Sequence, residues 1–274
     1  MEEYMSFRIV YGRAGTGKSE YCYREIAQKI KEENKILIIT PEQFSFTAEK
    51  KLMDAIDTQA VLNAEVVTLS RMAYRVINEI GGKTETNLSK CGKAMLIYSI
   101  LNNNKKELKF LGKTDENVDM LDTAITEFKK HGISIEQLSE EIAKQDDIYL
   151  KNKLKDLSIV YNGFEEQLSG KYIDETDLLT ILAENMENTD MFKEAVIYID
   201  EFAGFTSQEY QIIEKLVQIA KQVTITICTD ELHDIKNPDT DIFYSNQVTV
   251  NKLLEVAQNC ESKREEIKLE NTYR

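Results

Sequence analysis

Prolines and glycines are scarce in this sequence, which has only 2 and 11 of them among 274 residues. The scarcity excludes a collagen-like or low-complexity chain and favours long uninterrupted helices. Long hydrophobic runs are lacking as well, because no segment approaches the roughly 18 apolar residues of a membrane span. Residues 1–13 have acids and no basic stretch ahead of their apolar run, so we expect no signal peptide.

Cysteines and histidines are also few, and they form no recognisable ligand pattern. The 4 cysteines are scattered without a CxxC pair, and the 2 histidines lie far apart in the sequence. Reduced thiols are therefore favoured over a disulfide framework, and metal ligation by these residues is not expected. We expect a soluble, cytoplasmic protein without a membrane partner. The residues are Cys22, Cys91, Cys228, Cys260, His131 and His233.

Basic residues are outnumbered, with 34 Lys and Arg against 48 Asp and Glu, which gives a formal charge of −14. Non-specific DNA binding depends on clustered Lys and Arg, so this balance argues against a protein that coats DNA. It still permits one local DNA-binding groove, or DNA binding through a partner. We expect weak or no DNA binding by this chain alone.

Short apolar runs alternate with amphipathic helices at both ends of the chain. Continuous β-branched runs of this kind are typical of strands buried on both faces of a parallel sheet. Strand, helix, strand, helix is the pattern of an α/β fold. The expected strands are 7–11, 36–40, 65–69, 195–199 and 223–228, and the expected helices are 18–33, 46–56, 70–80, 207–221 and 249–258, followed by a polar tail.

The middle of the chain is different, because strand-like runs almost vanish and amphipathic helices replace them. They are expected at 88–102, 118–130, 135–144, 149–168 and 176–186. The sequence therefore predicts a parallel-sheet domain, residues 1–82 and 195–274, interrupted by a helical insertion, residues 83–194.

A glycine-rich segment between the first strand and the first helix fits the pattern GxxxxGK[ST]. Its glycines let successive backbone N–H groups face phosphate oxygens, and the following helix directs its positive end at them. The lysine neutralises the β- and γ-phosphates, and the serine hydroxyl ligates Mg²⁺. The predicted nucleotide-binding residues are Gly12, Arg13, Ala14, Gly15, Thr16, Gly17, Lys18 and Ser19.

Two acids follow the buried strand at 195–199. Asp200 is predicted to hold Mg²⁺ together with Ser19, and Glu201 is the residue type that polarises an attacking water in P-loop ATPases. The sequence contains no NKxD guanine signature, so ATP is favoured over GTP. The expected cofactors are ATP and Mg²⁺.

The long gap between Lys18 and Asp200 is typical of superfamily 1 helicases, in which a helical subdomain interrupts the first motor domain. The fold expected is a P-loop NTPase of RecA-like type, domain 1A of such a helicase, with a 1B-like insertion. Residues 40–43 and 68–71 end two strands where such helicases contact single-stranded DNA. Helix capping by Thr and Ser explains these residues equally well.

Six segments resemble, in order, the N-terminal part of the AddB family, the B subunit of the ATP-dependent helicase–deoxyribonuclease AddAB of the type found in Firmicutes. They are GRAGTGKSEYCYREI, LIITPEQFSFTAEKKL, VVTLSRMAYRVI, GKYIDETDLL, VIYIDEFAGFTSQEYQIIEKL and DIFYSNQVTVNKLLEVA. The resemblance implies an ATP-binding part of a subunit that pairs with an A subunit. It also implies that the complex resects double-strand DNA breaks to 3′ single-stranded tails for homologous recombination.

The same resemblance limits what this chain carries. In the family, the nuclease carboxylates and the cysteines of an iron–sulfur cluster belong to a later region, so neither is expected here. Arginine fingers come from a second motor domain, and their loss costs at least ~10³ in rate. We therefore expect Mg-ATP binding with little turnover. A vestigial, non-hydrolysing scaffold for DNA and the A subunit remains the main alternative, and a small-molecule kinase with a helical lid is a third.

Overall fold

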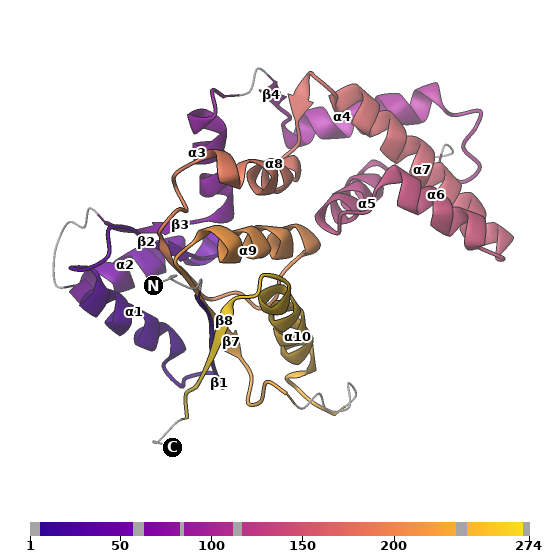
Figure 1. Cartoon of the computed structure of the whole chain (residues 1–274). Helices are drawn as coiled ribbons and strands as arrows, with labels where there is room; N and C mark the ends of the chain where they lie inside the picture. Colours follow the sequence, from indigo (N-terminus) through magenta and orange to yellow (C-terminus); the bar gives the residue numbers. More distant parts are fainter. Residues whose placement is uncertain (1–5, 57–62, 83–84, 112–116, 234–239, 271–274) are drawn as a thin grey trace. The chain divides into compact units, whose positions relative to one another are not determined.

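A computed structural model describes residues 6–56, 63–82, 85–111, 117–233 and 240–270 of the chain. The fold is α/β, and the chain divides into two compact units (Figure 1). Unit 1 consists of residues 1–81 and 181–274, and unit 2 of residues 82–180. The second boundary lies inside the insertion predicted from the sequence, which ended at residue 194. The domain division at 82/83 and 194/195 stays a prediction.

Unit 1 is built on a six-stranded sheet with the strand order β3-β2-β6-β7-β1-β8. Every neighbouring pair in this sheet is parallel. The carboxyl ends of all six strands therefore meet at one edge. The strands are β1 (Ser6–Gly12), β2 (Ile36–Ile39), β3 (Ala64–Val67), β6 (Val196–Ile199), β7 (Gln222–Cys228) and β8 (Lys263–Lys268).

Helices cover both faces of this sheet, which explains why β2 and β6 are continuous apolar runs. On one face, α1 and α2 pack with alternate residues of β2 and β6, such as Ile38 and Tyr198. On the other face, α9 and α10 pack against each other and against β7 (Figure 1). The helices of unit 1 are α1 (Lys18–Lys29), α2 (Ser45–Ile56), α3 (Leu69–Glu79), α9 (Ser207–Ile219) and α10 (Tyr244–Asn259).

Strand β8 corrects the sequence prediction of a polar tail after α10. Its residues, KREEIK, are mostly exposed and contain one aliphatic side chain, so they show no hydrophobic run. β8 lies at the sheet edge, and within the part of the chain that the structure describes it pairs with β1 alone. Charged residues are common on edge strands because they discourage pairing with other chains. The strand is therefore defined by its pairing and not by its composition.

Unit 2 is mainly helical, as its amphipathic patterns predict. It contains α4 (Lys90–Asn103), α5 (Val118–Lys130), α6 (Ile135–Lys144) and α7 (Ile148–Leu168), and α8 (Asp177–Asn185) includes the boundary between the units. A small parallel pair, β4 (Thr86–Asn87) with β5 (Tyr172–Ile173), was not predicted. Side-chain caps begin three of these helices, at Ser89, Ser134 and Asp147.

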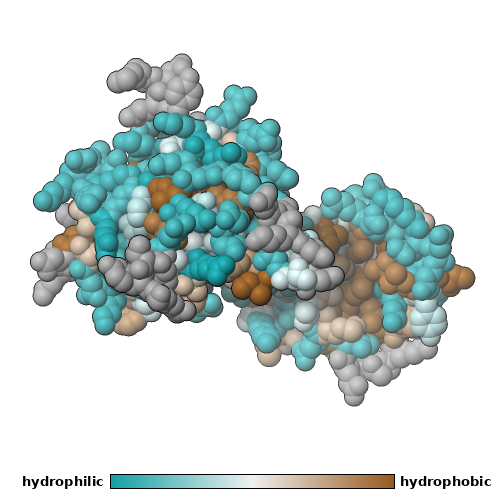
Figure 2. Space-filling model, turned by 90° about the horizontal axis from the view of Figure 1, so that it is seen from below, coloured by the Kyte–Doolittle hydropathy of each residue, from teal (hydrophilic) through white to brown (hydrophobic). Residues whose placement is uncertain are grey.

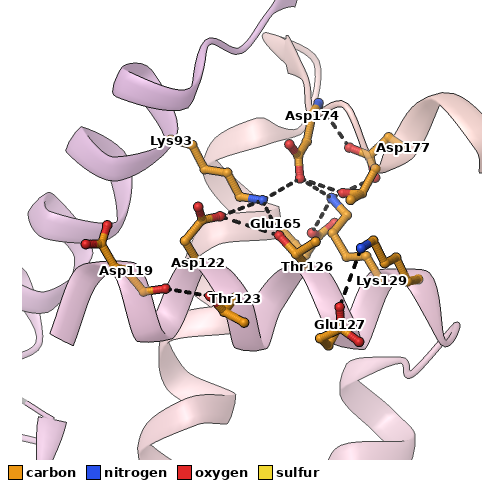
Figure 3. A network of polar contacts seen from close by, with 12 residues as sticks. Lys93, Asp119, Asp122, Thr123, Thr126, Glu127, Lys129, Glu165, Asp174 and Asp177 are labelled. Atoms are coloured by element: carbon orange, nitrogen blue, oxygen red, sulfur yellow. Dashed lines mark hydrogen bonds and ion pairs between the residues drawn. The ribbon is translucent and has the colours of Figure 1, made fainter. Parts of the chain in front are cut away.

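A buried ion network joins the helices of unit 2 (Figure 3). The ammonium group of Lys93 lies 3.0 Å from Asp174 Oδ2 and 2.9 Å from Asp122 Oδ1. That of Lys129 lies 2.6 Å from Asp177 Oδ1 and 3.0 Å from Glu165 Oε1. Both ammonium groups also lie 5.5 Å from the centre of the Phe164 ring. The network therefore ties α4, α5 and α7 to the segment that follows β5.

The charges in this network shift the pKa values of Asp174 and Lys129. Burial alone would raise the pKa of Asp174, but the hydroxyl of Thr176 and the ammonium groups of Lys93 and Lys129 hold it below its usual range. Burial alone would lower the pKa of Lys129, but the nearby carboxylates, Asp177 first, raise it. Both groups are thus held in their charged forms.

Among the described residues, no helix is both long and apolar enough to cross a membrane. The face of the molecule in Figure 2 is mostly hydrophilic, and hydrophobic residues gather there in separate patches.

All four cysteines are free thiols.

Candidate functional site

The glycine-rich loop, residues 12–19, connects β1 to α1 at the carboxyl edge of the sheet. Gly17 caps α1 with φ 82° and ψ 26°, a left-handed conformation that glycine adopts without strain. A Cβ atom on Gly12 would lie 2.5 Å from the backbone oxygen of Leu269, just beyond β8. Both glycines are therefore needed for the path of the loop, one for its dihedral angles and one for its close contact.

Lys18 lies at the start of α1 and folds back over the loop. Its ammonium group donates hydrogen bonds to the backbone oxygens of Gly12, at 2.9 Å, and Arg13, at 3.0 Å. No side chain of the described residues caps this helix, and N–H groups in a first helical turn have no partner within the helix. The loop thus combines a positive side chain with the positive end of a helix, which is an arrangement suited to a phosphate group.

Asp200 directly follows β6 at the same edge of the sheet, and its side chain is almost completely buried, with 4% of the residue exposed. Its Oδ1 accepts a 2.5 Å hydrogen bond from the hydroxyl of Thr226 on the neighbouring strand β7. Its Oδ2 is buried and accepts no hydrogen bond from the described residues. A buried carboxylate oxygen of this kind needs a positive or donating partner.

Glu201 is the next residue and has φ 68°, which is unusual for a residue other than glycine. Its Oε1 lies 3.4 Å from the hydroxyl of Ser19, which donates to it, and 3.0 Å from the ammonium group of Lys51 on α2. Ser19 and Glu201, which are 182 positions apart in the sequence, are therefore in contact. Strained backbone of this kind is often found at functional sites.

These residues share one cavity of about 630 Å³. It is lined by seven of the ten residues predicted to form the nucleotide site and by seven further residues from α1, α2, β7, α10 and the segment after β6. The predicted residues are Ala14, Gly15, Gly17, Lys18, Ser19, Asp200 and Glu201, and the further ones are Glu20, Lys51, Phe202, Ala203, Thr226, Cys228 and Asn246.

The other three predicted residues, Gly12, Arg13 and Thr16, line a second cavity of about 470 Å³ on the β8 side of the loop. There, the guanidinium group of Arg13 lies 3.1 Å from Asp230 Oδ2 and 5.8 Å from the centre of the Phe243 ring. The loop therefore separates these two cavities, and the larger one contains both predicted acids.

The residues of the larger cavity fit a magnesium ion. In proteins, Mg²⁺ usually takes one or two side-chain oxygens and completes its shell with water and substrate phosphates. Asp200 Oδ2 is a buried oxygen in need of such a partner, and the Ser19 hydroxyl lines the same cavity. Within the described ranges, no group of three or more His, Cys, Asp or Glu side chains is arranged to hold a metal by itself.

Two contributors to this cavity could not be found by sequence reasoning. Thr226 lies in an alternating strand pattern, but its contact with Asp200 depends on β7 lying beside β6 in the sheet. Lys51 lies on an amphipathic helix with no motif of its own. Of the strand-end residues considered for DNA contact, Thr68 caps α3 by accepting a hydrogen bond from the N–H of Arg71.

The fold and this cavity define an α/β protein with a glycine-rich loop and two adjacent acids at the carboxyl edge of a parallel sheet. The family model described as "ADDB, N-terminal" matches residues 9–274. The chain belongs to this family.

Several curated relatives are similar over almost the whole chain, and each is named as the B subunit of an ATP-dependent helicase/deoxyribonuclease. The relative from Clostridium tetani (strain Massachusetts / E88) is 43% identical over 92% of this chain, and one from Clostridium botulinum (strain Loch Maree / Type A3) is 40% identical over 93%. A third, from Thermoanaerobacter sp. (strain X514), is 39% identical over 92% of the chain. The chain spans 22–23% of the length of these relatives.

Proposed function

We infer that unit 1 is a P-loop NTPase domain that binds ATP with Mg²⁺. The carrying observation is that Asp200, whose buried Oδ2 accepts no hydrogen bond from the described residues, lines the same cavity as Lys18 and Ser19. A site for a magnesium nucleotide requires a loop that binds the phosphates and a carboxylate that ligates the cation, both in one cavity. In this proposal the loop residues bind the phosphates, and Ser19 and Asp200 hold the cation.

The same geometry suggests how the chain's residues contribute to hydrolysis. Lys18 supplies positive charge to the terminal phosphates, and Glu201 positions the attacking water and accepts its proton. Bound Mg²⁺ neutralises part of the charge that develops on the phosphate oxygens. Glu201 lies beside Ser19, so the base and the cation ligand act on the same phosphate group.

The parallel sheet, its helical interruption and the family membership support a finer assignment. We assign unit 1 to the RecA-like type, as domain 1A of a superfamily 1 helicase, with unit 2 as the 1B-like insertion. The relatives' names and the sequence resemblance support placing the chain at the N-terminus of the B subunit of a helicase–nuclease. That complex acts on DNA with an A subunit and resects double-strand breaks to 3′ tails for homologous recombination. The nuclease site and the iron–sulfur cluster that the resemblance implies for the family are not expected within residues 1–274.

The thermal melting of the 274-residue chain tests the nucleotide site. A ligand that binds only the folded state stabilises it by about 2.7 kcal/mol at a concentration 100 times its Kd. We expect Mg-ATP to raise the melting temperature, GTP to have less effect, and Lys18→Ala to remove the shift. Lys31→Ala, an exposed lysine just beyond α1, is the matched control and should keep it. An equal shift in the Lys18→Ala protein would contradict the proposal.

A non-hydrolysing scaffold is the second candidate function, and the contact between Lys51 and Glu201 favours it. An ammonium group 3.0 Å from Oε1 engages the carboxylate that hydrolysis would need as a base. In this reading the chain binds ATP and holds DNA and the A subunit without turnover.

Hydrolysis under single-turnover conditions separates these two functions. The enzyme proposal predicts slow hydrolysis that Glu201→Gln abolishes while ATP binding is retained. The scaffold proposal predicts that the chain and its Glu201→Gln variant hydrolyse ATP at the same background rate. The comparison should be repeated in the full heterodimer with DNA, because the arginine finger that accelerates such reactions comes from outside this chain.

A further inference from the structure

Two lysine-rich segments of unit 2 are brought together at the N-terminal end of α7. Residues 105–110, KKELKF, follow α4, and residues 146–155, DDIYLKNKLK, include the first two turns of α7. Together they contain six lysines and three acids, although the whole chain has a formal charge of −14. The excess of positive charge is therefore local.

A buried carboxylate holds the first segment against the second. Asp156 on α7 is 1% exposed and accepts hydrogen bonds from three consecutive backbone N–H groups, those of Lys109, Phe110 and Leu111, at 3.1, 2.7 and 3.1 Å. The ammonium group of Lys109 also donates to Asn152 Oδ1 at 3.0 Å. The position of the segment is thus set by several bonds and not by one flexible side chain.

Aromatic and aliphatic side chains lie among these lysines. The rings of Phe110 and Tyr149 are 4.9 Å apart and tilted by 54°. Tyr149 is 66% exposed and its neighbour Ile148 is 74% exposed, so both side chains are accessible from solvent. Lys153 follows Tyr149 by one helical turn and therefore lies on the same side of α7.

The six lysines differ from most other basic residues of the chain in having no acidic partner. Within the described residues, none of Lys105, Lys106, Lys109, Lys151, Lys153 and Lys155 has a carboxylate oxygen within 4.0 Å of its ammonium group. The lysine pair at 129–130 offers a contrast, because Lys129 is buried in the ion network and Lys130 pairs with Glu127. Six lysines without an acidic partner therefore lie together at residues 105–110 and 146–155, although Lys109 donates to Asn152 and Lys151 donates to the backbone oxygens of Ala143 and Gln145.

We propose that this surface, formed by residues 105–110 and 146–155, binds a single-stranded polynucleotide. Lysines that have no acidic partner among the described residues attract the regularly spaced phosphates, and an exposed tyrosine ring offers a flat face on which a base can stack. Stacking of this type tolerates any base, so the surface is expected to bind with little sequence preference. The surface belongs to unit 2 and uses no residue of the glycine-rich loop, so the proposal does not rest on the nucleotide site.

Charge is the reason to choose a polynucleotide over a protein as the occupant. Protein interfaces are depleted in lysine at their centres, because a lysine loses hydration and side-chain entropy when it is covered. Here Lys153 lies one turn along α7 from the exposed ring, and Lys109 directly precedes Phe110, whose ring packs against it. A polyanion gains counterion release from the same lysines.

The test measures the binding of the 274-residue chain to a labelled 20-nucleotide oligo-dT by fluorescence anisotropy. The salt concentration is varied between 20 and 200 mM, because binding to phosphates depends strongly on salt. We expect weak binding at the low-salt end, with a Kd in the range of ~10⁻⁴–10⁻⁶ M. The Lys153→Gln/Lys155→Gln variant should reduce the slope of log affinity against log salt by about 1.4, or ~0.7 for each lost phosphate contact. Tyr149→Ala should weaken binding about tenfold, and Tyr149→Phe should bind like the wild type.

A matched control removes the same charge elsewhere in unit 2. Lys90 at the start of α4 and Lys171 after α7 are both exposed, and each lies at the helix end opposite to the proposed surface. The rise of 1.5 Å per residue puts them more than ~20 Å from it. The Lys90→Gln/Lys171→Gln variant should therefore keep both the affinity and the salt slope. The Lys18→Ala variant should also keep them, which separates this proposal from the nucleotide site.

Four results would contradict the proposal. The first is an absence of oligonucleotide binding at 20 mM salt. The second is a loss of affinity in the Lys90→Gln/Lys171→Gln control that equals the loss in Lys153→Gln/Lys155→Gln. The surface would be a protein interface if the Tyr149→Ala and Lys153→Gln/Lys155→Gln variants bound the oligonucleotide like the wild type but associated more weakly with the A subunit. If duplex DNA of the same length bound as tightly and was insensitive to Tyr149→Ala, the stacking role would be wrong.

Discussion

The ammonium group of Lys51 on α2 lies 3.0 Å from Oε1 of Glu201, the residue that follows Asp200 at the end of β6. The same oxygen accepts a hydrogen bond from Ser19 at the start of α1. Three elements that are distant in the sequence therefore meet at one carboxylate oxygen. If Glu201 is the base for hydrolysis, Lys51 is a positioning residue that restrains it.

Replacing Lys51 by alanine should release Glu201 and raise the single-turnover hydrolysis rate about threefold or more, because the carboxylate is then no longer held by the ammonium group and can turn toward the attacking water. Lys50→Ala, the exposed neighbour on α2, is the control and should leave the rate unchanged. In the Glu201→Gln background, Lys51→Ala should have no effect. A fall in rate on Lys51→Ala would show that Lys51 assists the reaction and does not restrain it.

Thr226→Val should destabilise unit 1 by about 1–3 kcal/mol, since it leaves the buried Asp200 carboxylate without its hydroxyl donor. Thr226→Ser retains the hydroxyl and serves as the control. Urea unfolding of the two variants and the wild type measures the difference. Equal stability of the valine and serine variants would mean that this hydrogen bond contributes little.

Lys129→Met should cost about 3 kcal/mol near pH 7, because it leaves Asp177 and Glu165 without their ammonium partner in a largely buried network. Methionine preserves the length of the side chain against Phe164. Lys130→Met removes an exposed pair with Glu127 and should cost less than about 1 kcal/mol. Similar losses in both variants would contradict the assigned importance of the network.

The pH dependence of this network follows from its pKa shifts. The pKa of Asp174 is lowered on folding, so its stabilisation is present above about pH 4 and is lost as the pH falls further. The pKa of Lys129 is raised, so its stabilisation is present below about pH 10 and is lost as the pH rises through the folded value. Urea titrations should show the largest difference between wild type and Lys129→Met between these limits. A difference that grows outside them would contradict this account.

Asp156→Ala should destabilise unit 2 by roughly 2 kcal/mol, because three backbone N–H groups lose their common acceptor. Near-ultraviolet circular dichroism of the Phe110 and Tyr149 rings should change at the same time. Asn152→Ala, which removes only the exposed contact with Lys109, is the control and should have a small effect on both measurements. An unchanged spectrum in the Asp156→Ala protein would show that the segment is held by other contacts.

Much of the fold could be predicted because its elements have strong local patterns. The continuous apolar runs of β2 and β6 predict strands covered on both faces, and the 3.6-residue periodicity of α5 and α6 predicts their bounds as observed. β8 could not be predicted, because an edge strand made of KREEIK is held by pairing and not by burial. Helix α10 begins at Tyr244, earlier than predicted, since its first turn is polar.

The candidate site could be predicted only in part, for a similar reason. The glycine-rich loop and the acids after β6 follow local patterns, and their assigned chemistry stays a prediction. The contacts of Asp200 with Thr226 and of Glu201 with Lys51 depend on strand order and helix placement, which are not local. Clusters of lysines in the sequence also do not show which lysines are exposed, because Lys129 is buried in the ion network and Lys153 is exposed.

The most direct test of the central claim is the affinity of the chain for ATP, measured by titration calorimetry with and without Mg²⁺, in the wild type and in Asp200→Asn. If residues 12–19 and Asp200 form one magnesium nucleotide site, Mg²⁺ should tighten ATP binding by about tenfold or more in the wild type, or ~1.4 kcal/mol. Asp200→Asn should lose most of that gain and retain the weaker binding by the loop. ATP binding that ignores Mg²⁺, or a magnesium effect that survives in Asp200→Asn, would contradict the claim.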